Sequence, residues 1–254
     1  MTDPRALSIQ TARDVILLKL GPKRILVVGC DSTGAVGRKP LDSLKVHPSI
    51  VGKFTARVAL MEVIATGARP ISLSIALCVE PSPTGREIME GVHRELKASR
   101  LQDVTLVQSS EKNFPVKQTG VGATVIGITG NQRPKIGKCK HNDWLIAVGR
   151  PAVGRDVIEG ERTGSITNLN DAMDLLRLRY VHEILPVGSR GISREAGIIA
   201  ADSQLNYLPA RNVGVNVKKS AGPATAIICA IDSLKFSELN KTIDKPLTFI
   251  GKLR

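Results

Sequence analysis

The sequence lacks several features that would identify a membrane, disulfide-bonded or RNA-binding protein. Aromatic residues make up only 3% of the chain, which leaves few platforms on which single-stranded bases can stack. No run of about 18 or more apolar residues occurs, so a membrane-spanning helix is excluded. The N-terminal stretch MTDPRALSIQTARD is polar and contains two acids, so it does not resemble a secretory signal.

Cysteines are few and widely spaced. Cys30, Cys78, Cys139 and Cys229 offer neither a Cys-x-x-Cys metal site nor a disulfide framework. Such spacing is typical of proteins in a reducing compartment. We therefore expect buried structural thiols and a cytoplasmic location.

Positive charge is in excess, with 36 Lys and Arg against 23 Asp and Glu and a net charge of +13. A basic surface attracts polyanions, which include both nucleic acids and phosphorylated small molecules. The basic residues are scattered without a long block, and aromatics are rare. We therefore expect a protein that acts on nucleotides or other small phosphorylated molecules, with neither nucleic acid nor a membrane as partner.

Apolar patterns of strand and helix type alternate along both halves of the chain. In the first half they predict strands at 13–21, 24–30, 71–79, 104–108 and 121–130 and helices at 49–67 and 83–100. The polar segment 131–138 is the best candidate linker, and the strand and helix pattern restarts after it. This organisation predicts a mixed α/β (α+β) protein with domains at 1–135 and 136–254.

Three acids lie near glycine-rich backbone, although the common nucleotide motifs are absent. No segment has the spacing of a Walker A loop, and no GxGxxG opens a helix after a strand. Asp31 follows a predicted strand and opens the loop 29–40, Glu62 lies in the helix 49–67, and Glu111 begins a polar loop. Hard cations such as Mg²⁺ prefer carboxylate ligands. Taken singly, these acids are more typical of ordinary structural positions: Asp31 of a turn, Glu62 of a partly exposed helix surface and Glu111 of a solvated loop.

The segments around these acids resemble a known superfamily. CDSTGAVG, GKFTARVALMEVIATGARP and SSEKNFPVKQTGVGATVIG are similar to the ordered N-terminal motifs of aminoimidazole-ribonucleotide synthetases and thiamine-monophosphate kinases, the PurM-like superfamily. Asp31, Glu62 and Glu111 match the family's three acids. Met-Glu replaces the usual Asn-Asp of the helix motif, and SSEK replaces the GGDT turn. Within the superfamily, CVEPSPTGREIMEG and SSEKNFPVKQTG are most similar to α-ribazole kinase.

The resemblance implies a two-domain fold. In it, the N-terminal strands of two chains form a shared barrel in a homodimer, and the C-terminal half forms an α/β sandwich. NDWLIAVG and TAIICAI followed by TFIGK resemble strands of the family's second domain. The family's SDG turn appears here as GSRG, with Arg190 in place of the Asp, so we expect a different acceptor substrate.

The resemblance also implies an ATP- and Mg²⁺-dependent kinase that transfers the γ-phosphoryl group to the 5′-hydroxyl of a nucleoside, with α-ribazole as the expected acceptor. Alternatives are a thiamine-monophosphate kinase, an ATP-dependent cyclo-ligase of the aminoimidazole-ribonucleotide-synthetase type, and a non-catalytic nucleotide-binding protein.

Site residues follow from the same resemblance. Asp31, Glu62 and Glu111 are the expected metal ligands. The expected ATP contacts are Gly34, Gly37, Lys39, Lys112, Asn113 and Thr119, although the two lysines are equally typical of a solvated surface. Ser189, Arg190, Ser220 and Gly222 mark loops expected to line the acceptor site. No histidine has a partner arrangement that would identify a general base.

Overall fold

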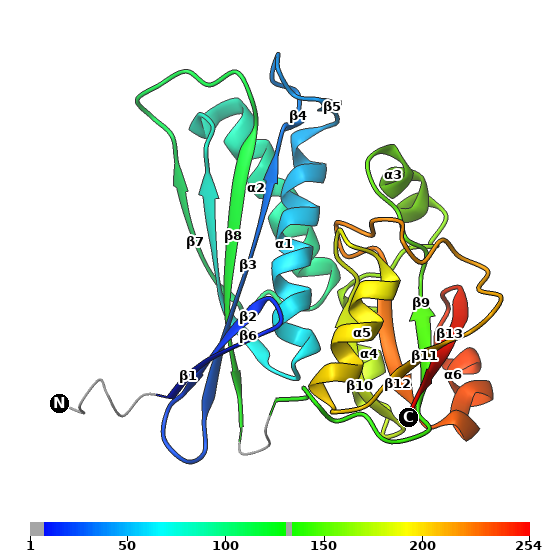
Figure 1. The fold of residues 1–254 in the computed structure, drawn as a ribbon. Helices are drawn as coiled ribbons and strands as arrows, with labels where there is room; N and C mark the ends of the chain where they lie inside the picture. Colours follow the sequence, from blue (N-terminus) through cyan, green and yellow to red (C-terminus); the bar gives the residue numbers. More distant parts are fainter. Residues whose placement is uncertain (1–7, 131–133) are drawn as a thin grey trace. The chain divides into compact units, whose positions relative to one another are not determined.

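The computed structural model describes residues 8–130 and 134–254, which fall into two compact units (Figure 1). Unit 1 is formed from Met1–Ile64 and Ala68–Gln132, and unit 2 from Ala65–Gly67 and Arg133–Arg254. Of the predicted linker 131–138, residues 131–133 lie outside the described residues.

Unit 1 is built on a six-stranded sheet with the order β1-β2-β3-β8-β6-β7. Its strands are β1 (Ser8–Ala12), β2 (Val15–Lys19), β3 (Ile25–Gly34), β6 (Arg69–Leu77), β7 (Thr105–Ser110) and β8 (Gly120–Thr129). β6 and β7 run parallel, and the other neighbouring strands run antiparallel. The long β3–β8 pair extends from Ile25 opposite Thr129 to Gly34 opposite Gly120, so β3 ends where β8 begins.

Two helices, α1 (Pro48–Ala65) and α2 (Arg86–Ala98), cover one face of this sheet (Figure 1). A short π-helical turn, η2 (Pro81–Gly85), precedes α2. The two helices touch through their backbones, because a Cβ on Gly52 would lie 1.9 Å from the carbonyl oxygen of Ile88, and one on Gly91 would lie 1.9 Å from that of Ser49. Only glycine permits this approach.

A buried ion pair joins α1 to α2. The guanidinium of Arg57 donates to both carboxylate oxygens of Glu95 at 2.7 and 3.0 Å, and each side chain is 2% exposed. The guanidinium also lies 4.7 Å from the centre of the Phe54 ring. Inside a protein, such a bidentate pair fixes geometry, and each charge depends on the other for compensation.

Unit 2 is built on a five-stranded antiparallel sheet with the order β10-β12-β9-β13-β11. Its strands are β9 (Trp144–Val148), β10 (Val181–Pro186), β11 (Tyr207–Pro209), β12 (Ile227–Ile231) and β13 (Leu247–Leu253). Its helices are α3 (Arg155–Arg162), α4 (Leu169–Arg177), α5 (Ile192–Asp202) and α6 (Phe236–Thr242), with a 3₁₀ turn, η3 (Ser233–Lys235), before α6.

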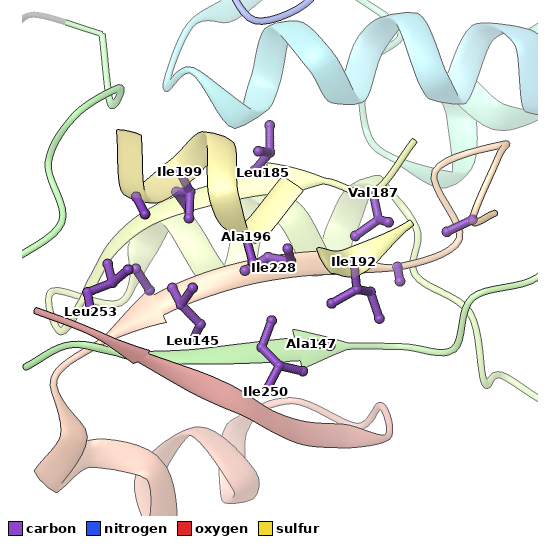
Figure 2. Packing of buried hydrophobic residues seen from close by; sticks show 14 residues of the cluster. Leu145, Ala147, Leu185, Val187, Ile192, Ala196, Ile199, Ile228, Ile250 and Leu253 are labelled. Carbon is purple, nitrogen blue, oxygen red and sulfur yellow. The ribbon is translucent and has the colours of Figure 1, made fainter. Parts of the chain in front are cut away.

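Alternation along β9 divides the core of unit 2 between two faces of the sheet. Leu145 and Ala147 pack with Ile192, Ala196 and Ile199 of α5 (Figure 2). Trp144 lies on the opposite face, with ring centroids 6.0 Å from Phe236 of α6 and 4.7 Å from Phe249. Helices therefore cover both faces, and the predicted mixed α/β class is confirmed.

Two sequence-based expectations need correction. Asp31 was expected to open a loop after a strand ending at residue 30, but β3 continues through it to Gly34 because β8 supplies hydrogen-bonding partners along that whole length. The cysteines were expected to be buried, yet only Cys229 is, while Cys30 and Cys78 are exposed on the side of the sheet away from the helices. Among the described helices, none is long and apolar enough to span a membrane.

We predict that Glu95→Gln lowers the free energy of unfolding by about 3 kcal/mol or more, because it leaves the Arg57 charge buried without its counterion. Urea unfolding followed by circular dichroism measures this. Glu90→Gln on the same helix is the matched control, since Glu90 faces Arg86 in an exposed pair at 4.0 Å and should change stability by less than about 0.5 kcal/mol. Equal effects of the two substitutions would contradict this assignment.

Candidate functional site

Two segments meet at the end of the β3–β8 pair in unit 1, and Asp42 holds them together. They are segment 34–45, which follows β3 and includes the short strands β4 (Val36–Gly37) and β5 (Leu44–Lys45), and loop 111–119, which precedes β8. The Asp42 carboxylate is 5% exposed and accepts hydrogen bonds from the amide of Lys39 at 2.8 Å and from the amide and hydroxyl of Thr119, each at 2.7 Å. Further hydrogen bonds run from the Leu41 amide to the Lys117 carbonyl and from the Ala35 amide to the Thr119 carbonyl.

The two predicted glycines of this segment have different surroundings. Gly37 has a φ of +151°, and a Cβ there would lie 2.5 Å from the Thr119 hydroxyl and 2.7 Å from the Asp42 carboxylate. A Cβ on Gly34 would have no heavy atom within 4 Å. Gly37 is therefore required for packing, whereas Gly34 leaves the backbone open to the approach of a ligand.

The lysines of segment 34–45 are engaged within the protein. The Lys39 ammonium forms a short ion pair with Glu80, which also accepts from the Thr84 hydroxyl. Burial by itself raises the pKa of Glu80, but the hydrogen bonds from Lys39 and Thr84 outweigh it, so the pKa lies below its ordinary value. The Lys45 ammonium donates to the carbonyls of Lys39 and Pro40. Lys39 therefore connects segment 34–45 to the turn before α2.

Glu111 turns its carboxylate back onto its own loop. It accepts from the amides of Asn113 at 2.6 Å and Phe114 at 3.1 Å, while its own amide donates to the carbonyls of Leu77 and Val79. These backbone hydrogen bonds lower the pKa of Glu111. Lys112 and Asn113 are exposed on the same turn.

Asp31 lies on the face of β3 that meets α1. A Cβ on Gly29 would lie 3.5 Å from the Cβ of Glu62 on α1, and the Thr33 hydroxyl is 2.7 Å from that of Thr55 on α1. Because side chains alternate between the two faces of a strand, Asp31, midway between Gly29 and Thr33, faces the same helix. Burial raises the pKa of Asp31, partly offset by a hydrogen bond from Ser32, and the charge of Asp14 raises it further. Asp14, in the turn between β1 and β2, is thus a carboxylate neighbour that the sequence did not indicate.

The three predicted metal ligands do not converge. Asp31 pairs across the sheet with Ala123, Ile75 and then Gln108, and Glu111 lies three residues beyond Gln108. Three strand spacings across and three residues along place Asp31 and Glu111 roughly 17 Å apart. Within residues 8–130 and 134–254 no three His, Cys, Asp or Glu side chains form a metal-binding group. The expected cluster of Asp31, Glu62 and Glu111 is therefore not formed, because the sheet separates Glu111 from the other two.

The predicted nucleotide-contact residues do share one end of unit 1. Gly34, Gly37 and Lys39 lie in segment 34–45, and Lys112 and Asn113 lie in the loop joined to it through Asp42. Thr119 needs correction, since its hydroxyl is buried and donates to Asp42 rather than being available to a ligand.

The predicted acceptor residues of unit 2 lie in two loops that touch each other. The Ala221 amide, between Ser220 and Gly222, donates to the Gly188 carbonyl beside Ser189 and Arg190. A Cβ on Gly191 would lie 2.8 Å from the Val217 carbonyl oxygen, so the start of α5 also packs against the second loop. The buried Thr225 hydroxyl accepts from the Ala152 amide at 2.9 Å and holds the base of that loop.

One histidine has a partner that sequence spacing did not reveal. The His182 Nδ1 lies 2.7 Å from the carboxylate of Asp143, 39 positions away, which also accepts from the Lys140 amide. His182 is at the start of β10, and Ser189 follows the end of that strand. The pair therefore holds the segment before β9 rather than the predicted acceptor loops.

The sequence analysis did not identify Asp14, Asp42 or Glu80 as site residues, and among them only Asp42 lies in a recognisable sequence pattern. The Pro-Leu-Asp-Ser run that contains it is typical of a turn, where Asp accepts backbone hydrogen bonds. The partners of Asp14 and Glu80 come from other elements, so their roles depend on tertiary structure.

Comparison with known families identifies the first unit. Residues 12–129 match the family described as AIR synthase related protein, N-terminal domain. The resemblance drawn from the three N-terminal motifs is therefore confirmed for this part of the chain, while the narrower resemblance to α-ribazole kinase remains a prediction. By sequence, no curated protein matches the chain.

Solved structures show the same fold at low identity. Thiamine-monophosphate kinase from Stenotrophomonas maltophilia K279a is 18% identical, with a TM-score of 0.64 over 99% of this chain and 89% of that chain. AaThiL complexed with AMPPCP and TMP is 16% identical, with a TM-score of 0.63 over 95% of this chain and 84% of that chain. The hydrogenase maturation protein HypE of E. coli is 13% identical, with a TM-score of 0.66 over 90% and 79%. The predicted PurM-like fold is confirmed, while the barrel shared between two chains remains a prediction.

We predict that Gly37→Ala destabilises the protein by about 2 kcal/mol or more, because the new methyl group meets Thr119 and Asp42 in a backbone conformation unfavourable for alanine. Hydrogen–deuterium exchange should become faster in segment 34–45 and at residues 117–119. Gly34→Ala is the matched control and should leave exchange unchanged, since its methyl group enters open space. Faster exchange in both variants would show that the contacts of Gly37 are not the cause.

Proposed function

We propose that the chain is an ATP-dependent phosphotransferase that moves the γ-phosphoryl group of ATP to a hydroxyl of a small nucleoside-like acceptor. The observation that carries the proposal is the partly buried Asp31, which faces α1 on the strand that leads into the exposed backbone at Gly34. A candidate cation ligand, Asp31, and a candidate phosphate contact, Gly34, therefore lie three residues apart on the same strand. The fold shared with thiamine-monophosphate kinases supports the same reading.

The carboxylates fit Mg²⁺. Asp31 is partly buried and Asp14 adds like charge, so a bound cation would relieve the charge of Asp31. Asp31 and Asp14 would hold the ion, with Glu62 on the adjoining turn of α1. When bound, Mg²⁺ neutralises charge on phosphate oxygens.

The remaining residues of the site position the nucleotide. Gly34 lets phosphate oxygens approach its backbone closely, and the exposed Lys112 offers a cation on the adjoining loop. Lys39 supports them indirectly, since its pairing with Glu80 fixes segment 34–45. Phosphoryl transfer needs mainly such positioning, because little covalent chemistry falls to the protein.

For the acceptor we propose α-ribazole, phosphorylated on its 5′-hydroxyl. The support is the resemblance of CVEPSPTGREIMEG and SSEKNFPVKQTG to α-ribazole kinase, together with Arg190 in place of an acid in the GSRG turn. Thiamine monophosphate is the alternative favoured by the structure of AaThiL complexed with AMPPCP and TMP. Cyclo-ligase chemistry and nucleotide binding without turnover are the further alternatives.

We also propose a homodimer that covers the open face of the unit 1 sheet. On that face Ile9, Ile16 and Val107 are 64, 42 and 60% exposed. A shallow hollow of about 380 Å³ is lined by residues of β3, β6, β7 and β8, among them Cys30, Asp31, Val107 and Thr124. Exposed apolar side chains on one face of a sheet favour association, and a second copy of the same face would bury them.

The decisive test incubates the purified chain with Mg²⁺ and ATP and offers α-ribazole, thiamine monophosphate and aminoimidazole-ribonucleotide precursors separately. Mass spectrometry identifies the product. We expect a mass gain of one phosphoryl group on α-ribazole and formation of ADP. ATP binding without any product would instead support the non-catalytic alternative.

Asp31→Asn should abolish turnover yet raise the stability of the ligand-free protein. The folded chain raises the pKa of Asp31, so the charged carboxylate destabilises the fold above that pKa, and a neutral side chain removes this penalty. The stability gain should therefore be largest at neutral pH and should diminish as pH falls through the raised pKa. Thermal unfolding at several pH values measures the stability gain, and the phosphoryl-transfer assay measures turnover. Thermal unfolding with and without Mg²⁺ should also show that Mg²⁺ stabilises the wild type more than the variant.

Glu111→Gln is the matched control for a metal-binding role. Because Glu111 already accepts two amides of its own loop, the amide oxygen of glutamine can replace it there. We expect turnover to stay within about tenfold of the wild type, which corresponds to a loss of about 1.4 kcal/mol. A loss of turnover as complete as that expected for Asp31→Asn would instead support Glu111 as a metal ligand.

A further inference from the structure

Phe114 is exposed although the chain has few aromatic residues. Of its four phenylalanines, Phe54 is 7% exposed under the Arg57 guanidinium, and Phe236 and Phe249 pack around Trp144. Phe114 is 75% exposed. Leaving such a ring in water forgoes the burial that stabilises the other three.

The backbone that carries Phe114 is fixed at both ends of its loop. On one side, the Glu111 carboxylate accepts the Phe114 amide, and the Glu111 amide is bonded to the end of β6. On the other side, Thr119 is held by Asp42, and the Gln118 side chain donates to the Leu41 carbonyl at 3.0 Å. The loop therefore displays the ring on an ordered support, which limits the entropy lost when a ligand binds to it.

The groups around the ring have the chemistry of a nucleotide contact surface. Lys112 and Lys117 are exposed on the same loop, and Asn113 directly precedes Phe114. A nucleotide combines a flat heteroaromatic ring with anionic phosphates, so an exposed aromatic face near ammonium groups complements both of its parts. Leu41, 61% exposed on the adjoining segment, adds apolar surface at this end of the unit.

We propose that Phe114 is the stacking platform for the base of the bound nucleotide, and that loop 111–119 selects ligands with an aromatic base over bare polyphosphate. This inference rests on the proposed function, since it assigns the base end of the nucleotide whose phosphates meet Gly34. Glu111 then acts as a positioning residue that presents the ring. The role explains how a glutamate bonded to its own loop contributes to the site without binding metal.

Isothermal titration of the full chain with two probes tests the proposal, namely Mg²⁺-ATP and Mg²⁺-tripolyphosphate, which lacks a base. Phe114→Leu keeps the apolar bulk but removes the aromatic face, and it should weaken ATP binding about tenfold while leaving tripolyphosphate binding unchanged. Phe114→Trp should restore ATP binding. Its added indole should also be quenched by ATP and not by tripolyphosphate, measured against the fluorescence of Trp144.

Leu234→Ala is the control for removal of an exposed apolar side chain, since Leu234 is 87% exposed on η3 of unit 2, and it should bind both probes as the wild type does. If Phe114→Leu weakened the binding of ATP and tripolyphosphate equally, or did not weaken ATP binding, the stacking role would be overturned while the proposed function stayed intact. Failure of the wild type to bind either probe would instead defeat the proposed function, and with it this inference.

Discussion

The buried carboxylate of Asp42 is the constraint on which the candidate site depends. It accepts three hydrogen bonds, one from segment 34–45 and two from Thr119, directly before β8. Such a group is tolerated in the interior only when its oxygens are satisfied, and each hydrogen bond to a charged acceptor is stronger than one between neutral groups. Because Gly37 packs against the same carboxylate, a side chain there would separate the two segments. The open backbone at Gly34 and the ordered display of Phe114 both follow from this junction.

The sheet divides the site into two parts with different chemistry. At β3, Asp31 is partly buried and the negative charge of the exposed Asp14 adds to its own, which favours a cation. At the far edge, β7 leads into a loop whose acid is already satisfied by backbone amides and whose exposed side chains are cationic or aromatic. A ligand with anionic phosphates and a flat ring matches this separation, whereas a metal ion alone would occupy only the first part.

Much of the fold was predictable because it follows local patterns. The apolar repeat that predicted a helix at 49–67 corresponds to α1, and the amphipathic pattern at 83–100 corresponds to α2 and the turn before it. The length of β3 was not predictable, since its last residues are polar and remain in the strand only because β8 pairs with them. The site was partly predictable in the same sense. The motifs located Asp31 and the glycine segment, but Asp14, Glu80 and the separation of Glu111 depend on which strands become neighbours, and that information is not local.

The departure of the chain from the usual GGDT turn has a physical consequence. In SSEK, the Glu111 carboxylate accepts the amides two and three residues further on. The acid of this turn is therefore engaged by its own loop and orders it. The proposed function accordingly assigns the cation to the carboxylates on the β2–β3 side of the sheet and the organic part of the ligand to the loop after β7.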